Sequence, residues 1–274
     1  MAFPVSLPRD IPLATVTQPA KTLWVIELHN GSDNRLTHDL IGKAFLPALD
    51  EVERCWRRQW REAQRAEGED GGRGAVIIVG NRKQDKFFGN GLDFASALKD
   101  PLFFVKLFDP MIHRLLTFPI PTIAALNGHT FAGSFALALA CDYRVMTDGC
   151  ARNAWLCMNE VHIGGTLSFQ FGTLVKAKVT DAQTARKVVL EGHRFTPPEA
   201  LACGLVDHLV QGDTEAVLQK AREVASAVSV HAQAGAWGLI RSHVYGESVQ
   251  AFGRSSEYPV KTVALDDMVA KSRL

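Results

Sequence analysis

The sequence of 274 residues has few cysteines, almost no net charge and no Cys-x-x-Cys pair. An odd number of cysteines without such a pair argues against a disulfide framework and against a zinc site, and it favours a reducing compartment. Thirty lysines and arginines balance 29 aspartates and glutamates to a formal charge of +1. The charge therefore predicts neither a nucleic acid nor an anionic membrane as partner, and it leaves a small, locally charged ligand open. The five cysteines are Cys55, Cys141, Cys150, Cys157 and Cys203.

Segments that direct a chain to a membrane or to secretion are also missing. No run of about 18 uncharged apolar residues predicts a membrane span, and the start lacks the charged-then-apolar pattern of a secretory signal. At the other end, Lys271 precedes Ser272-Arg273-Leu274, which resembles the Ser-Lys-Leu type of peroxisomal address. We therefore expect a soluble protein without a membrane span that reaches the peroxisome through an import receptor, with a chance match of three residues as the alternative.

Short β-branched, apolar runs alternate with helical patterns along the chain. This alternation predicts right-handed crossovers and an α/β fold with a mainly parallel sheet, with ligands where strands end and helices begin. We expect one compact unit, in which residues 1–210 form an α/β core and residues 211–274 form a helical region and tail packed on it. The strands are expected at 23–28, 75–79, 122–126, 143–146 and 205–210, and helices at 37–65, 94–117, 214–229 and 233–246, with another from Gly133.

Two glycine-bearing turns lie at such strand-to-helix junctions. One is the segment Asn127 to Asp142, in which Gly133 opens an apolar helix, and the other is Phe87 to Phe94 with Gly89 and Gly91. Glycine lets the backbone approach a ligand, and helix starts leave amide groups without partners. Two such turns can supply the two donors of an oxyanion hole, as acyl or enolate chemistry requires. Tight packing of a helix start is the structural alternative.

The patterns of several enzyme classes are absent. The chain has no Gly-x-Ser-x-Gly elbow, no Walker A loop and no His-Glu-x-x-His pattern, and Phe94 breaks the Gly-x-Gly-x-x-Gly spacing after Gly89 and Gly91. A proton carrier is nevertheless available, because Glu160 is an acid in apolar company. Desolvation there would raise its pKa toward a value useful for proton transfer, whereas an arginine-paired carboxylate at a strand end is the alternative.

In this order, the segments resemble the enoyl-CoA hydratase/isomerase (crotonase) superfamily from about residue 20 to 255. The family's first oxyanion turn, Phe-x-Ala-Gly-Ala-Asp-Leu, corresponds to Phe88 through Phe94, which implies the Leu92 N–H as one donor. Its second turn corresponds to Asn127 through Asp142, which implies the Gly133 N–H as the other. The resemblance further implies a crotonase-like (ClpP/crotonase) spiral core of repeated ββα units with a C-terminal helical region, assembled as a homotrimer or hexamer.

One departure from the family pattern indicates the branch. Hydratases carry two glutamates that handle water, and Ala136 stands where the first belongs, while Glu160 matches the second. A single acid in a Met-Asn-Glu context is similar to the Δ3-Δ2-enoyl-CoA isomerases, which act in fatty-acid β-oxidation. By this resemblance the Leu92 and Gly133 amides hold the thioester oxygen of a 3-enoyl-CoA, and Glu160 moves a proton from C2 to C4. This proton transfer requires no metal or redox cofactor, so none is expected. Coenzyme A is part of the substrate and is not a cofactor.

The same resemblance places further residues against the substrate: Gly89, Asn90, Gly91, Asp93, Gly128 and His129. For His129 a structural role is the alternative, and Arg82, Lys83 and Lys86 are either contacts for the CoA phosphates or surface charges. Another crotonase-type reaction, namely hydration, hydrolysis or a step of specialised metabolism, and noncatalytic acyl-CoA binding remain the alternatives. Acyl chain length is not predicted by any of these patterns.

Overall fold

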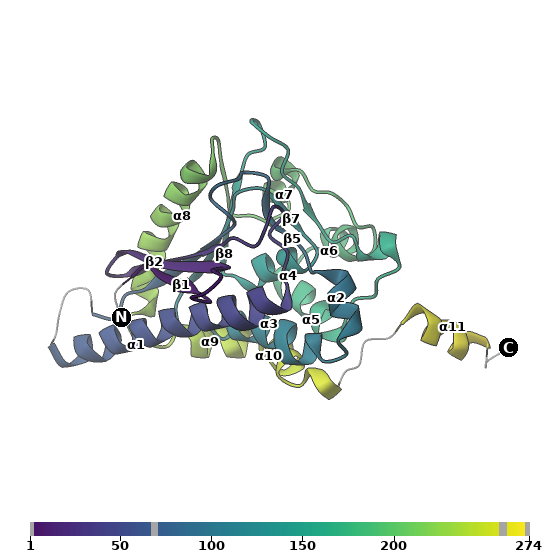
Figure 1. The fold of residues 1–274 in the computed structure, drawn as a ribbon, viewed down its shortest axis with the longest axis horizontal. Coiled ribbons are helices and arrows are strands. Elements are labelled where there is room, and N and C mark those ends of the chain that lie inside the picture. The colour runs from purple at the N-terminus through teal and green to yellow at the C-terminus, as the bar shows by residue number, and fades with distance from the viewer. Residues whose placement is uncertain (1–2, 67–70, 258–261, 272–274) are drawn as a thin grey trace.

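A seven-stranded sheet forms the centre of the molecule in the computed structural model, which describes residues 3–66, 71–257 and 262–271 (Figure 1). The strand order is β1-β2-β3-β4-β6-β8-β10, antiparallel over the first three strands and parallel from β3 onward. The five strands expected from the sequence are confirmed, although the last begins at His208. The strands are β1 (Val5–Leu7), β2 (Ala14–Ala20), β3 (Leu23–Leu28), β4 (Ala75–Val79), β6 (Thr122–Leu126), β8 (Tyr143–Thr147) and β10 (His208–Val210).

A second, three-stranded parallel sheet was not predicted. It consists of β5 (Phe87–Asn90), β7 (His129–Phe131) and β9 (Leu156–Cys157), in that order. Each of its strands follows a strand of the large sheet, so β4 continues into β5, β6 into β7 and β8 into β9. Helices α2 (Phe94–Lys99) and α4 (Gly133–Ala140) and the 3-10 turn η3 (Glu160–Ile163) come next. The expected α/β core of repeated ββα units is therefore confirmed.

Helices cover both faces of the large sheet, which explains why its central strands are apolar on both sides. On one face, Ile77, Ile123 and Val145 pack with Val217 and Ala221 of α8 (Thr214–Val228). The other face belongs to the main core with α1 (Leu46–Ala66), α3 (Asp109–Leu116) and α4. All eight residues of α4 are buried, as expected for a helix that is apolar around its whole circumference.

The remaining helical elements lie mostly toward the C-terminal end of the chain. Helix α10 packs against α3 and α5, and α9 contacts α3 and α10. Figure 1 shows α11 extending away from the body of the molecule. Within the described ranges, no helix combines the length and apolarity that crossing a bilayer requires. These elements are α5 (Phe169–Lys178), α6 (Ala182–Val189), α7 (Pro197–Ala202), α9 (Trp237–Val244), α10 (Gly246–Gly253) and α11 (Val263–Lys271), with the 3-10 turns η4 (Ser229–Ala232) and η5 (Ser255–Glu257). Two π-helical segments, η1 (Leu40–Phe45) and η2 (Phe104–Phe108), precede α1 and α3.

Candidate active site

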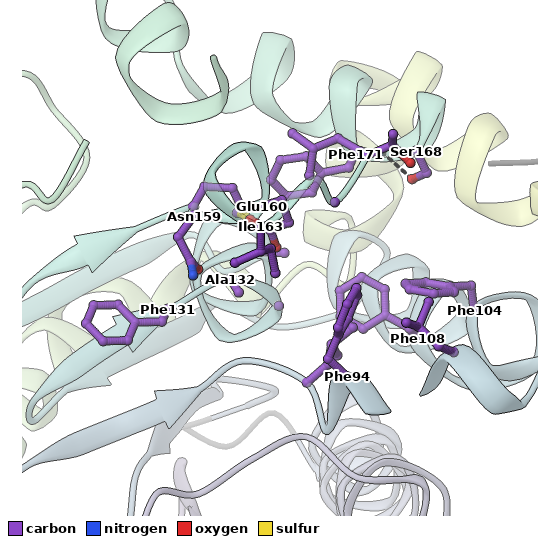
Figure 2. A pocket seen from close by; sticks show the side chains of 18 of the residues that line it. Phe94, Phe104, Phe108, Phe131, Ala132, Asn159, Glu160, Ile163, Ser168 and Phe171 are labelled. Carbon is purple, nitrogen blue, oxygen red and sulfur yellow. Dashed lines mark hydrogen bonds between the residues drawn. The ribbon is translucent and has the colours of Figure 1, made fainter. Parts of the chain in front are cut away.

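The three residues predicted to be catalytic follow the three strands of the small sheet. Leu92 lies just after β5, Gly133 just after β7 and Glu160 just after β9. Because these strands are parallel and adjacent, their carboxyl ends meet at one edge of the sheet. The register pairs Asn90 with Phe131, which brings the first two turns side by side. All three residues line one cavity of about 570 Å³ (Figure 2).

The two turns are fastened to each other. The Gly91 N–H donates to Ser134 Oγ at 3.1 Å, and a Cβ placed on Gly89 would lie only 2.3 Å from the same Oγ. Glycine at position 89 is thus needed for this close approach, and the Ser134 hydroxyl accepts the hydrogen bond that joins the two turns. A Cβ on Gly133 would lie 2.8 Å from Leu92 Cδ2, so the two candidate donor residues are in direct contact.

The backbone amides of Leu92 and Gly133 donate no hydrogen bond within the described part of the chain. The residues next to them in the chain are held by hydrogen bonds instead. Asp93 N–H donates to Leu36 O at 3.2 Å, and Ala132 N–H donates to Cys157 O at 2.8 Å. Ala132 has φ 50° and ψ −124°, a conformation that is costly for a residue with a side chain and that is often found at functional sites. Two unpaired amides held by fixed neighbours can receive a developing oxyanion.

Glu160 faces the same cavity from a tight turn. Its carbonyl accepts a hydrogen bond from Gly165 N–H at 2.8 Å, and Gly164, with φ 67°, closes the turn. Glu160 Oε2 has no access to solvent, and no donor among the described residues reaches it. An orphaned carboxylate oxygen in an apolar cavity has the surroundings expected of a proton acceptor that awaits substrate. The alternative of an arginine-paired carboxylate finds no support in the described contacts.

Burial sets the protonation of this acid. Desolvation raises the pKa of the Glu160 carboxyl above its ordinary value of 4.5, because the charged form loses hydration. A base must be deprotonated, so the rate of a reaction in which Glu160 takes a proton should fall as the pH drops through this raised pKa. We predict that kcat/KM declines toward acid at a higher pH than an ordinary glutamate would give. A pH profile of the initial rate measures this, and a rate that stays constant down to the ordinary glutamate range would contradict it.

The cavity walls are apolar and rich in phenylalanine. Phe94, Phe104 and Phe108 gather on one side of Ala132, and Phe131 lies on the other (Figure 2). Ala136 also lines the cavity, one helical turn after Gly133 and in the position where a hydratase of the resembling family would carry its first glutamate. Glu160 is the one carboxylate among the described residues that line this space.

The lining also contains polar side chains, among them that of Arg35, which was not predicted from the sequence. Arg35 lines the cavity and pairs with Asp33 at 2.7 Å. Asn90 also lines the cavity, and its Nδ2 donates to Asp33 Oδ2 at 3.0 Å. One feature of the sequence could have indicated Arg35: it lies in the polar segment that follows the first predicted strand, at the carboxyl edge of the sheet.

The remaining predicted contact residues lie outside the lining of this cavity. Gly89 and Gly91 shape the first turn, and Asp93 accepts a hydrogen bond from Ser96 Oγ at 2.6 Å before α2. His129 stacks on Phe131, with 5.1 Å between ring centroids, and its Nδ1 accepts from Trp155 N–H at 3.1 Å. Desolvation, with Lys86 and Arg194 nearby, lowers the pKa of His129, so the ring is neutral at pH 7. These contacts support the structural alternative for His129.

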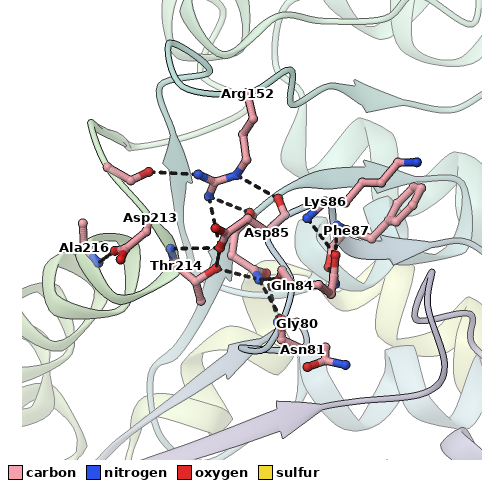
Figure 3. Close-up of polar contacts among 12 residues, drawn as sticks. Gly80, Asn81, Gln84, Asp85, Lys86, Phe87, Arg152, Asp213, Thr214 and Ala216 are labelled. Atoms are coloured by element: carbon pink, nitrogen blue, oxygen red, sulfur yellow. Dashed lines mark hydrogen bonds and ion pairs between the residues drawn. The ribbon is translucent and has the colours of Figure 1, made fainter.

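The loop before β5 is anchored by polar contacts of Asp85 with Arg152 and Thr214 (Figure 3). Asn127 Oδ1 accepts from Gly80 N–H at 3.2 Å, and Asn127 Nδ2 donates to Thr214 Oγ1 at 3.1 Å. Arg152 donates to Asp85 O at 2.8 Å and to Asn127 O at 2.9 Å. A Cβ on Gly128 would lie 2.4 Å from Lys86 O. Asn127 and Gly128 thus hold the loop that leads into β5.

The basic residues predicted as alternatives for phosphate binding do not line the cavity either. Arg82 pairs with Glu215 at 2.9 Å and lies with Lys83 in a separate shallow hollow near the start of α8. Lys86 lies over the Phe87 ring at 5.4 Å. These contacts fit the surface-charge alternative for all three residues.

Comparisons with known proteins show which family the chain resembles in sequence. Residues 64–240 match the family model described as enoyl-CoA hydratase/isomerase. Enoyl-CoA delta isomerase 3 of Arabidopsis thaliana is 34% identical over 183 residues, which cover 64% of this chain and 75% of that protein. The peroxisomal enoyl-CoA delta isomerase 2 of the same plant is 32% identical over 185 residues, with the same two coverages of 64% and 75%. A putative enoyl-CoA hydratase of Thermus thermophilus is 32% identical over 174 residues, covering 60% of this chain and 63% of the relative.

Solved structures share the fold at lower identity. An enoyl-CoA hydratase/isomerase family protein from Pseudomonas syringae has a TM-score of 0.70 and 22% identity, covering 90% of this chain and 98% of the other. An enoyl-CoA hydratase from Mycobacterium marinum has a TM-score of 0.66 and 23% identity, with coverages of 88% and 94%.

Proposed function

The chain belongs to the enoyl-CoA hydratase/isomerase family, and we propose that it is a Δ3-Δ2-enoyl-CoA isomerase of fatty-acid β-oxidation. It would move the double bond of a 3-enoyl-CoA to the 2-trans position. One observation carries this proposal: the described lining of the cavity contains a single carboxylate, that of Glu160, and has the methyl group of Ala136 where a second acid would stand. Two relatives named as delta isomerases support it.

The proposed reaction needs only groups that this chain supplies. The Leu92 and Gly133 amides donate to the thioester oxygen and stabilise the enolate that forms when Glu160 takes a proton from C2. The same carboxyl, now protonated, returns a proton at C4. A buried acid with a raised pKa suits both steps, because desolvation makes the carboxylate a better proton acceptor while its protonated form can still return the proton. The electrons stay within the substrate, so the proposal includes no metal or redox cofactor.

Coenzyme A enters the proposal as part of the substrate. We place its phosphates toward Arg35, the basic side chain of the described lining, rather than toward Arg82, Lys83 and Lys86. Arg35 is held near the mouth by Asp33, which Asn90 also contacts. A guanidinium forms charge-assisted hydrogen bonds with phosphate oxygens.

Hydration is the main rival, because relatives named as hydratases also match this chain. Adding water to a 2-enoyl-CoA requires that a water molecule be positioned and deprotonated, and Ala136 offers no group for this. We predict that incubation with a 2-enoyl-CoA gives no 3-hydroxyacyl-CoA, as analysed by chromatography of the products. Accumulation of the hydroxy ester would make the protein a hydratase. Tight binding of both isomers without any turnover would instead support a noncatalytic acyl-CoA-binding protein.

The experiment that tests the isomerase proposal is a direct assay. Purified protein is mixed with a 3-enoyl-CoA, and the absorbance of the conjugated thioester is followed. The proposal predicts its appearance, with formation of the 2-trans ester confirmed by chromatography. Unchanged substrate at high enzyme concentration would contradict the proposal.

We also propose that the protein is peroxisomal and assembles as a trimer or a pair of trimers. The tripeptide Ser272-Arg273-Leu274, which would be read by the import receptor, lies outside the described residues. Two relatives from Arabidopsis thaliana are named as peroxisomal, and a human relative is named as mitochondrial. We predict that a fluorescent protein fused to the N-terminus of the full chain collects in peroxisomes and that deletion of the last three residues disperses it. Equal peroxisomal import without the tripeptide would exclude this signal.

The proposed trimer or pair of trimers is tested by sedimentation, which measures the mass of the oligomer.

A further inference from the structure

Besides Val263 of α11, which is 61% exposed, three large apolar side chains are exposed although they line the same cavity as Glu160. They are Phe94 and Leu98 of α2 and Ile163 of η3, with exposed fractions of 37%, 65% and 58%. We call these three residues the mouth collar. Single exposed apolar residues are common on protein surfaces, whereas a group that rims a binding cavity indicates a contact surface for a ligand.

The mouth collar continues an apolar wall that reaches inward. Phe104 and Phe108 line the cavity behind Phe94, and their rings meet edge to face at 5.8 Å between centroids. Figure 2 shows Phe94, Phe104 and Phe108 together on one side of Ala132. An aliphatic chain whose C2 and C4 lie at Glu160 therefore finds apolar contacts along this side as far as the protein surface.

The lining also indicates which part of a thioester each region accepts. Arg35 and Asn90 offer a charge and an amide, which suit the polar CoA portion. The cavity of about 570 Å³ must hold the thioester and the reacting carbons as well as the start of the chain. A long chain would therefore leave the cavity and cover the mouth collar, which removes its apolar surface from water.

We propose that the mouth collar binds the distal part of a long acyl chain, so that the preferred substrates are long-chain rather than short-chain 3-enoyl-CoA esters. This inference rests on the proposed isomerase function. It names the mouth collar as the surface that sets chain-length preference, while the chemistry at Glu160 is the same for every chain length.

The test compares two esters and two variants. Leu98→Ser and Ile163→Ser are assayed with 3-hexenoyl-CoA and 3-tetradecenoyl-CoA, at concentrations below micelle formation. We expect each variant to lose about tenfold in kcat/KM with the long ester and less than about twofold with the short one, since apolar contacts in a pocket are worth factors of this size. Wild type should prefer the long ester.

Matched controls come from similarly exposed apolar residues elsewhere on the surface. Leu239 of α9 is 68% exposed and Ile11 is 71% exposed, and neither lines the cavity. Leu239→Ser and Ile11→Ser should leave the ratio of the two kcat/KM values unchanged. Thermal unfolding of all four variants checks that each one is folded.

Several outcomes would overturn the inference and leave the proposed function intact. The inference is overturned if the wild type has a kcat/KM for the short ester that equals or exceeds that for the long one. It is also overturned if the mouth-collar variants lower kcat/KM equally for both esters. Sedimentation is included because a change of oligomeric state in Leu98→Ser or Ile163→Ser would make the mouth collar a contact between copies of the chain. Absence of turnover with both esters would instead contradict the isomerase proposal itself.

Discussion

Replacing Glu160 by glutamine should lower kcat for a 3-enoyl-CoA by roughly 10²–10⁴-fold, the range that general acid–base catalysis supplies. Glutamine keeps nearly the same shape but cannot accept the C2 proton. The described lining offers no other carboxylate to replace Glu160. The contacts to the thioester and the acyl chain are left in place, so KM should change little. Initial rates followed through the conjugated product measure both constants.

The control for this variant is Glu62→Gln, which changes an exposed glutamate of α1 in the same way. It should have the kcat of the wild type. If Glu160→Gln is as fast as wild type, Glu160 is not the base. If it loses activity only because KM rises, the residue contributes to binding rather than to proton transfer.

Replacing Gly133 by alanine should lower kcat/KM by about 10²–10³-fold, as loss of an oxyanion donor typically does. The added Cβ would lie 2.8 Å from Leu92 Cδ2 and 3.2 Å from the Phe108 ring. The Leu92 side chain must therefore shift, and any movement of its turn or of the start of α4 that goes with this displaces an amide that would hold the thioester oxygen. Steady-state kinetics measure this loss, and thermal unfolding separates it from a loss of folded protein.

Gly172→Ala in α5 is the matched control, because a Cβ at that position would meet nothing within 4 Å. This variant should be as active as wild type. Full activity of Gly133→Ala, together with normal stability, would show that the amide positions around Leu92 and Gly133 do not matter for the rate.

The apolar pattern of the sequence predicted five of the seven strands of the large sheet, whereas the ββα units that include the small sheet were implied only by the family resemblance. Strands such as β4 and β6 are five-residue, largely apolar runs. A strand that is buried on both faces can be recognised from such a run in the sequence. The strands of the small sheet have only two to four residues, and β5 contains a glycine. They exist because neighbours distant in sequence pair with them, as Phe87 does with His129. The hairpin of β1 and β2 was also not predicted: β1 has only three residues, and β2 contains Pro19.

The candidate site likewise contains residues that were predicted from the sequence and residues that were not. Glu160, Leu92 and Gly133 were predicted from glycine turns, an acid in apolar surroundings and a family resemblance, and the structure brings them to one cavity. Arg35 and the phenylalanines of the cavity wall were not predicted, because their role depends on how helices and loops orient side chains in space. The roles of Gly128 and His129 depended on such orientation too: Gly128 packs against Lys86, and His129 lies in β7 and stacks on Phe131.

The most direct test of the account is a crystal structure of the Glu160→Gln variant with a 3-enoyl-CoA bound. The account predicts that the thioester oxygen lies about 2.7–3.1 Å from both the Leu92 and the Gly133 nitrogen. It also predicts that the side chain at position 160 reaches C2 and C4 of the same acyl chain. A thioester oxygen far from those amides, or a side chain at position 160 that points away from both carbons, would contradict it.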